Sequence, residues 1–312
     1  MMSSGIHART ASPSSLAGPV VVYEWGTWAP DFLIFSLFPH AARIAALPAQ
    51  SVEEVMTVLP AMATRFVFHL NCTITGRFPT SRAQLIPALA ARGIAAVNAE
   101  ANDISKRTIQ RCCLDSGLAS ALAGPDGPAD ESLIVKTNFN YGGYSERRLS
   151  DPERRLLDLP DPSDFMKTTQ DYKVLPRREV DPSWWENPSL TVERFIENRD
   201  GRCYRAYCLL HHVALCELVS QKRIKKMAGN TVRRVWMFTA GNGGVDGAGP
   251  DDYPSPVVQA LLRFRQSFPL DFGTIDVMED AMGLAYVVDV NTTPYYGVPV
   301  PGLVEHLQRA VL

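Results

Sequence analysis

The chain has 312 residues, of which 46% are hydrophobic and 21% are charged, and its formal net charge is −2. The length allows about two or three domains, and the composition is typical of a soluble globular protein. The nearly neutral charge excludes a general binder of polyanions, so we expect no nucleic-acid partner. Charged residues and prolines interrupt the most apolar window, residues 29–49, so we expect no membrane partner either.

The first residues and the cysteines bear on where the protein works. Residues 1–17 are rich in Ser and Ala and lack an apolar core, which predicts a disordered tail rather than a signal peptide. The six cysteines include no CxxC pair, which favours free thiols and a cytoplasmic protein. Residues 208–216 contain two cysteines and two histidines. Strand alternation would send these histidines to opposite faces, which argues against zinc.

From residue 18 to residue 101 the sequence alternates short apolar runs with helix-compatible segments. Strands are expected at residues 19–23, 65–70 and 94–97, and helices at residues 32–47, 51–62 and 84–92. Such alternation predicts a small open α/β domain with a parallel sheet.

Lys106 lies in a context that points to an anion. Ser105 is a predicted N-cap for a helix over residues 106–116, so Lys106 falls in the first turn. A cation there opposes the helix dipole, which favours a role toward a bound anion over local stabilisation. The alternative is an ordinary solvated lysine.

Lys136 ends an apolar strand, residues 132–136, and runs into a turn that contains Gly142 and Gly143. An ammonium group and the backbone N–H groups of a glycine turn can surround a phosphate, although no Walker A motif is present. The alternative is a solvated hairpin tip.

The segment from residue 150 to residue 190 is rich in Pro, Asp and Arg, which predicts a long surface connection. Trp184 and Trp185 are interpreted as its packing anchor. The basic run at residues 221–226 is either a solvated face or the lining of an anion site. Strands are further expected at residues 190–197, 203–210 and 213–220, a mobile glycine-rich loop at residues 240–249, and helices at residues 254–268 and 302–312.

Residues 271–294 read as a β-hairpin with a turn near Gly283. Asp289 and Asn291 are two residues apart, so they point to the same face of one strand, and Asp276 lies on the partner strand. Two carboxylates and an amide oxygen suit Mg²⁺, which prefers oxygen ligands. The alternative is a half-buried hairpin with a polar outer face.

Taken in this order, the segments resemble the ATP-grasp superfamily over roughly residues 93–297. The likeness is carried by residues 93–98 with Ser105, Lys106, Gly117 and Leu118, by the strand that ends at Lys136, by the VERFI run at 192–196, and by DVNTTP at 289–294. The resemblance implies an α/β (α+β) protein with the ATP-grasp fold, in which an N-terminal open α/β domain, residues 18–101, precedes two subdomains, 102–190 and 191–312.

The resemblance also implies roles for particular residues. The groups that bind ATP would be Lys106 and Lys136 on the phosphates, Gly142 and Gly143 over the triphosphate, and Glu193, Arg194, Phe195 and Glu197 at the adenine and ribose. The catalytic groups would be Arg205 and Arg223, on the transferring phosphate and the acceptor carboxylate. Mg²⁺ or Mn²⁺ would be held by Asp276, Asp289 and Asn291.

One position departs from the family pattern, because Asp289 stands where the family usually has Glu. Asp is one methylene shorter, which makes bidentate bridging of two metal ions harder while it keeps a carboxylate in place.

The activity that the resemblance implies is ATP-dependent joining of a carboxylate to an amine or a thiol. ATP would convert the carboxylate to an acyl phosphate, and attack by the acceptor would release phosphate. A kinase that phosphorylates a hydroxyl, and a regulatory protein that binds nucleotide without turnover, remain as alternatives. The partners would be a small-molecule or peptide carboxylate and an amine acceptor, and a homodimer is an open alternative to a monomer.

Overall fold

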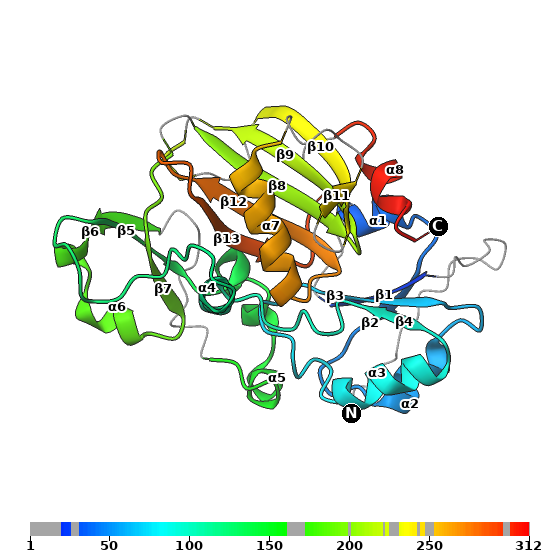
Figure 1. Ribbon diagram of the computed structural model, residues 1–312. Coiled ribbons are helices and arrows are strands. Elements are labelled where there is room, and N and C mark those ends of the chain that lie inside the picture. Colours follow the sequence, from blue (N-terminus) through cyan, green and yellow to red (C-terminus); the bar gives the residue numbers. More distant parts are fainter. Residues whose placement is uncertain are drawn as a thin grey trace.

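The computed structural model describes residues 20–25, 31–160, 172–198, 201–220, 222–224, 231–241, 244–246, 253–295 and 300–311. The predicted N-terminal tail, residues 1–17, lies outside these ranges, as do residues 242–243 and 247–249 of the predicted glycine-rich loop. The described strands form three sheets, each with helices beside it (Figure 1).

The first sheet is parallel and confirms the predicted open α/β arrangement. Its strand order is β2-β1-β3-β4, which places β1 and β3 in the middle and β2 and β4 at the edges. The elements are β1 Val20–Trp25, α1 Leu33–Leu37, β2 Ala42–Ala45, α2 Val52–Val58, β3 Arg65–Leu70, α3 Arg82–Ala91 and β4 Ala95–Val97.

The predicted helix over residues 32–47 is wrong, because the segment divides into α1 and β2. Pro39 disfavours helical geometry in the residue before it, so α1 ends at Leu37. The chain then turns and Ile44 pairs in parallel with Tyr23 of β1, which extends the sheet by one strand.

The second sheet is antiparallel, with the order β6-β5-β7. Its strands are β5 Ser132–Thr137, β6 Lys173–Pro176 and β7 Leu190–Arg194, and α6 Pro182–Glu186 lies against it. Trp184 and Trp185 of α6 pack against the buried side chains of Leu133 and Val135, which confirms their interpretation as a packing anchor. The prediction of a mere surface connection over residues 150–190 is wrong, because that segment also forms α5 Asp151–Leu156 and supplies β6 as a sheet strand.

The third sheet is antiparallel and has the order β11-β10-β9-β8-β12-β13 (Figure 1). Helices α4 and α7 cover one of its faces, where Ile275, Val277, Val287 and Val290 are buried. The elements are α4 Lys106–Asp115, β8 Arg202–Leu209, β9 His212–Val219, β10 Thr231–Gly241, β11 Gly244–Asp246, α7 Ser255–Ser267, β12 Phe272–Glu279, β13 Ala285–Asn291 and α8 Leu303–Gln308.

Strand alternation then determines which side chains leave that covered face. Because Ile275 and Val277 of β12 point toward α4 and α7, Asp276 points to the opposite face. Part of this opposite face packs on α1 and α8, and the rest carries the polar residues described below. None of the described helices is long and apolar enough to cross a membrane.

Candidate active site

The β12–β13 hairpin brings the two predicted metal-binding carboxylates together. Asp276 is paired with Asp289 across the two strands, and Thr274 is paired with Asn291. A register shift follows immediately, between Asp276 and Val277, so the hairpin departs from regular pairing beside the carboxylates. The side-chain oxygen of Asn291 accepts a hydrogen bond from the backbone N–H of Thr293 at 2.9 Å, which fixes its orientation.

Lys106 reaches this hairpin from the first turn of α4. Its side chain is only 4% exposed, and its Nζ lies 3.6 Å from Oδ1 of Asp289. The same ammonium donates to the carbonyl oxygen of Phe139 at 3.3 Å. The cation at the helix start therefore faces a carboxylate and the beginning of the glycine turn, rather than solvent.

Lys136 approaches the same hairpin from the second sheet. Its Nζ lies 2.6 Å from Oε2 of Glu193 and 3.5 Å from the carbonyl oxygen of Val288, the residue before Asp289. Glu193 is 1% exposed, and its other oxygen has no hydrogen-bond partner among the described residues. Loss of one member of such a buried pair leaves the other charge uncompensated, which costs about 3–5 kcal/mol.

Arg205 completes the cluster from β8. It is the cross-strand partner of Asp276, and its Nε and Nη2 donate to the two carboxylate oxygens at 2.7 and 2.6 Å. Burial alone would lower the pKa of Arg205, but the carboxylates of Asp276 and Asp289 raise it above its usual value. A forked guanidinium of this kind suits any planar or tetrahedral anion.

Cations and carboxylates therefore neutralise one another in pairs in this cluster. The lysines are nearly buried, whereas the side chains of Asp289 and Asp276 are 36% and 26% exposed. The oxygen donors of these carboxylates and of Asn291 fit the ligand preference of Mg²⁺. Among the described residues, no group of three or more His, Cys, Asp or Glu side chains could hold a metal ion, so Asn291 is needed for a third donor.

A cleft of about 350 Å³ opens between residues 194–197 and the turn of the β12–β13 hairpin. We call the segment of residues 190–198 the hinge. Three predicted adenine and ribose contacts, Arg194, Phe195 and Glu197, line it on the hinge side, and Met282 and Tyr286 line the hairpin side. This volume falls within the range of about 300–1,000 Å³ that small-molecule sites occupy. The fourth predicted contact, Glu193, points instead to Lys136.

Arg223 is not brought to the carboxylates of the hairpin, although the resemblance implied a role for it on the transferring phosphate and the acceptor carboxylate. Its guanidinium lies 3.9 Å from a carboxylate oxygen of Glu197 and 4.9 Å from the centre of the Phe195 ring. The side chain is 60% exposed. The sequence position of Arg223 after a strand did not show where its side chain points. In the structure the side chain lies at the hinge end of the cleft.

The predicted glycine turn forms the 3₁₀ segment η1, Asn140–Gly143, in which Gly142 and Gly143 have φ values of 67° and 68°. Asn140 anchors it, because its backbone N–H donates to the Thr73 hydroxyl at 2.9 Å and its side chain donates to the carbonyl of Val290 at 3.1 Å. The turn is thus fixed to the loop after β3 and to β13, next to the predicted metal-binding residues.

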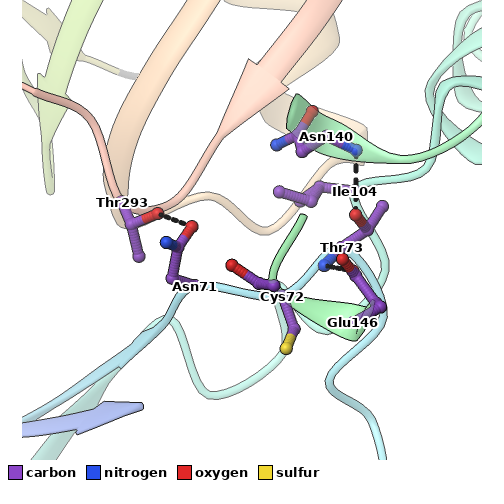
Figure 2. A pocket seen from close by; sticks show the side chains of 8 residues that line it. Asn71, Cys72, Thr73, Ile104, Asn140, Glu146 and Thr293 are labelled. Carbon is purple, nitrogen blue, oxygen red and sulfur yellow. Dashed lines mark hydrogen bonds between the residues drawn. The ribbon is translucent and has the colours of Figure 1, made fainter. Parts of the chain in front are cut away.

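Glu146 bonds the same residue, Thr73, that holds the glycine turn. The sequence did not predict that Glu146 belongs to the site. Figure 2 shows its carboxylate and the backbone of Asn140 meeting at Thr73, whose N–H donates to Glu146 at 2.5 Å. A cavity of about 10 Å³, room for a single water, lies between them and the Thr293–Asn71 hydrogen bond. Burial raises the pKa of Glu146, although hydrogen bonds from Thr73 and the charge of Lys106 oppose it.

Tyr172 is a second residue near the charged cluster that the sequence did not suggest. It stands directly before β6, and burial raises the pKa of its hydroxyl. The charge of Lys136 opposes this shift, and those of Asp289 and Glu193 add to it. The residue lies in no motif, so only the pairing of β6 with β5 could have placed it here.

No protein-family model and no curated protein sequence matches the chain. Solved structures do match. The RimK domain protein ATP-grasp from Sphaerobacter thermophilus DSM 20745 is 13% identical, with a TM-score of 0.50, over 93% of this chain and 98% of that one. The ATP-grasp ligase PsnB complexed with minimal precursor is 12% identical, with a TM-score of 0.49, over 89% and 92%. The macrocyclase MdnC from Microcystis aeruginosa MRC, bound with precursor peptide MdnA, is 10% identical, with a TM-score of 0.46, over 93% and 97%.

At these identities the likeness concerns the fold. Together with the three sheets and the cleft between the second and the third, it shows that the chain has the ATP-grasp fold. The predicted fold class, an α/β (α+β) ATP-grasp protein with an open α/β domain at its N-terminus, is therefore confirmed.

Proposed function

We propose that this protein is an ATP-dependent ligase. It activates a carboxylate as an acyl phosphate and joins it to an amine or a thiol, with release of ADP and phosphate. The observation that carries the proposal is the convergence of Lys106, Lys136 and Arg205 on Asp276 and Asp289 beside an open cleft. Phosphoryl transfer needs such a set, because catalysis rests on positioning and on charge neutralisation rather than on a side-chain nucleophile.

Strand β13 gives the order in which the parts of ATP would lie. Its first residues, with Tyr286, border the hinge cleft, and Val288 lies under Lys136. Asp289 and Asn291 follow further along. Adenine in the hinge cleft therefore directs the phosphates along β13 toward these two residues, past both lysines.

The protein's own groups divide the work. Lys106 and Lys136 hold the phosphates, and Gly142 and Gly143 cover them with backbone N–H groups. Arg205 stabilises the charge of the transferring group, for which its fork is suited. Asp276, Asp289 and Asn291 would hold Mg²⁺ or Mn²⁺, which supplies further neutralisation of phosphate charge.

Lys106 is paired with Asp289 and Arg205 with Asp276, so these groups would exchange partners when the substrates bind. Phosphate oxygens replace the carboxylates as partners of Lys106 and Arg205, and the freed carboxylates become available to the metal ion. Because each charge finds a new partner of the same sign as its old one, the exchange leaves no buried charge uncompensated.

Two other functions compete with this proposal. A kinase of the same fold would transfer phosphate to a hydroxyl and stop, and a regulatory protein would bind ATP without turnover. For the proposed ligase, the carboxylate and the amine would be small molecules or peptides.

The experiment that separates these functions measures ADP and free phosphate with a mixture of carboxylates, a mixture of amines, or both. A ligase releases phosphate in repeated turnovers only when both mixtures are present. Hydroxylamine added to the carboxylates alone should trap the acyl phosphate as a hydroxamate. A stable phosphorylated product without free phosphate would show a kinase, and binding of ATP without ADP formation would show a regulatory protein.

A further inference from the structure

Among the residues that the structure describes, three tyrosines are exposed, namely Tyr141, Tyr144 and Tyr295, with exposed fractions of 75%, 51% and 46%. Every other aromatic side chain whose burial is described is buried or half-buried. Exposed aromatic surface that gathers in one place on a soluble protein commonly marks a binding site.

The three rings belong to one patch, although they come from two distant segments. The rings of Tyr141 and Tyr144 lie 6.3 Å apart at an interplanar angle of 76°. Asn140, the residue before Tyr141, donates to the carbonyl of Val290 in β13, and Tyr295 follows that strand, so the two segments lie side by side. In agreement with this, burial and then the charges of Tyr141, Asp31 and Tyr144 raise the pKa of Tyr295. The patch thus combines three rings with one exposed carboxylate, and Arg148 lies 5.8 Å from the centre of the Tyr144 ring.

The patch has a rigid base. Tyr295 stacks on the buried ring of Phe32 at 4.3 Å, and the two residues form an isolated antiparallel bridge. The backbone N–H of Leu33 donates to the carbonyl of Pro294 at 2.9 Å, which holds the N-terminal domain against the end of β13. On the other side, Asn140 anchors the turn that carries Tyr141.

The position of the patch relative to β13 indicates which substrate it would contact. The strand leads from the hinge cleft at Tyr286 to Asp289 and Asn291, and Tyr295 comes four residues later. Adenine in the cleft would thus put the reacting end of ATP toward the tyrosines. A co-substrate enters from this side, because the nucleotide occupies the other.

We propose that Tyr141, Tyr144, Tyr295 and Asp31 bind a cationic group of the amine co-substrate, an alkylammonium or a guanidinium that is separate from the uncharged amine that attacks. This proposal rests on the proposed ligase function. The faces of tyrosine rings attract cations, and the Asp31 carboxylate adds to that attraction. The same groups disfavour the carboxylate co-substrate, whose charge suits Arg205 instead.

The test uses ethylguanidinium and its uncharged analogue ethylurea, which have the same shape and differ in charge. Each is titrated at millimolar concentration into the full chain labelled with ¹³C at the tyrosine rings, with MgADP present. Ethylguanidinium is expected to shift the ring resonances of all three tyrosines, whereas ethylurea leaves them unchanged. Equal binding of both compounds would overturn the proposal, since the patch would then be merely apolar.

Variants sharpen the test. Combined Tyr141→Ala and Tyr144→Ala should weaken ethylguanidinium binding about five- to thirty-fold, because two exposed cation–π contacts of about 0.5–1 kcal/mol each are lost. Combined Tyr141→Phe and Tyr144→Phe should stay within about two-fold of the native protein, since phenylalanine keeps the ring face. Asp31→Asn should weaken binding about three-fold. Met62→Ala, at a side chain that is 74% exposed on another part of the surface, is the matched control.

Two outcomes separate this inference from the proposed function. If MgADP binds but the tyrosine variants keep full affinity for ethylguanidinium, the cation site is wrong while the nucleotide site stands. If ethylguanidinium binds with the predicted selectivity but MgADP does not bind, the ligase assignment fails. Dimerisation that buries the three tyrosines, seen by sedimentation and abolished by the alanine variants, would also overturn the proposal.

Discussion

Asp289→Asn is expected to reduce nucleotide turnover at saturating Mg²⁺ about 10²-fold, the scale of losing one preorganised electrostatic stabiliser. The substitution replaces a charged metal ligand by a neutral amide, and it also removes the carboxylate that faces Lys106 at 3.6 Å. The fold should persist, because this side chain is 36% exposed and lies on the polar face of β13. Turnover is measured as ADP release against Mg²⁺ concentration, together with the midpoint of thermal unfolding.

The matched control is Asp115→Asn, the same chemical change at an exposed residue at the end of α4. It should leave both measurements unchanged. If Asp289→Asn retains native turnover at saturating Mg²⁺, the hairpin carboxylates are structural and hold no catalytic metal.

Arg205 and Arg223 should separate clearly in kinetics. Arg205→Ala is expected to lose about 10²-fold or more in kcat, because the fork acts on charge that develops only during phosphoryl transfer. Arg223→Ala should instead raise the KM for ATP with a small change in kcat, because its guanidinium contacts Glu197 and Phe195 at the hinge. A loss of uniform binding changes KM alone.

Arg205→Lys is the conservative variant for this comparison. It keeps the charge beside Asp276 but lacks the two parallel donors, so it should recover only part of the lost kcat. Binding of MgADP, measured by calorimetry, controls for a damaged nucleotide site. A large loss of kcat in Arg223→Ala with unchanged KM would show that this arginine moves to the transferring phosphate during turnover.

The sequence predicted the carboxylate hairpin, because apolar and polar residues alternate locally around Asp276 and from Asp289 to Asn291. It put Asp276 on the strand that pairs with the strand of Asp289, and the structure shows that the two residues lie directly opposite each other. It could not predict the ion pair between Arg205 and Asp276. The two residues are 71 positions apart, and they are neighbours only because β8 lies beside β12. Strand order in a sheet depends on the whole packed structure rather than on any local pattern.

Strand β10 was not predicted, for a local reason. A bulge falls between Val232 and Arg234, and it shifts the register with β9. The bulge breaks the alternation by which a strand is recognised, and Phe238 is the one fully buried side chain among the strand's residues.

Individual side-chain directions were the least predictable part of the site. The resemblance implied that Lys106 and Lys136 act together, and in the structure both lysines contact the β12–β13 hairpin. It gave no sign of Glu146, because that residue acts through a hydrogen bond to Thr73, 73 positions away. Motifs describe groups that touch the ligand, whereas the anchor of the glycine turn is set by contacts between domains.

Hydrogen exchange with and without a non-hydrolysable ATP analogue and Mg²⁺ tests the central claim, that one cleft holds the nucleotide from the hinge to β13. Bound nucleotide should slow exchange in three separate segments: the hinge at residues 190–198, the glycine turn at residues 140–146 and strand β13. The sheet β2-β1-β3-β4 should be unchanged. Protection confined to that parallel sheet, or absent from the glycine turn and the hinge together, would contradict the account.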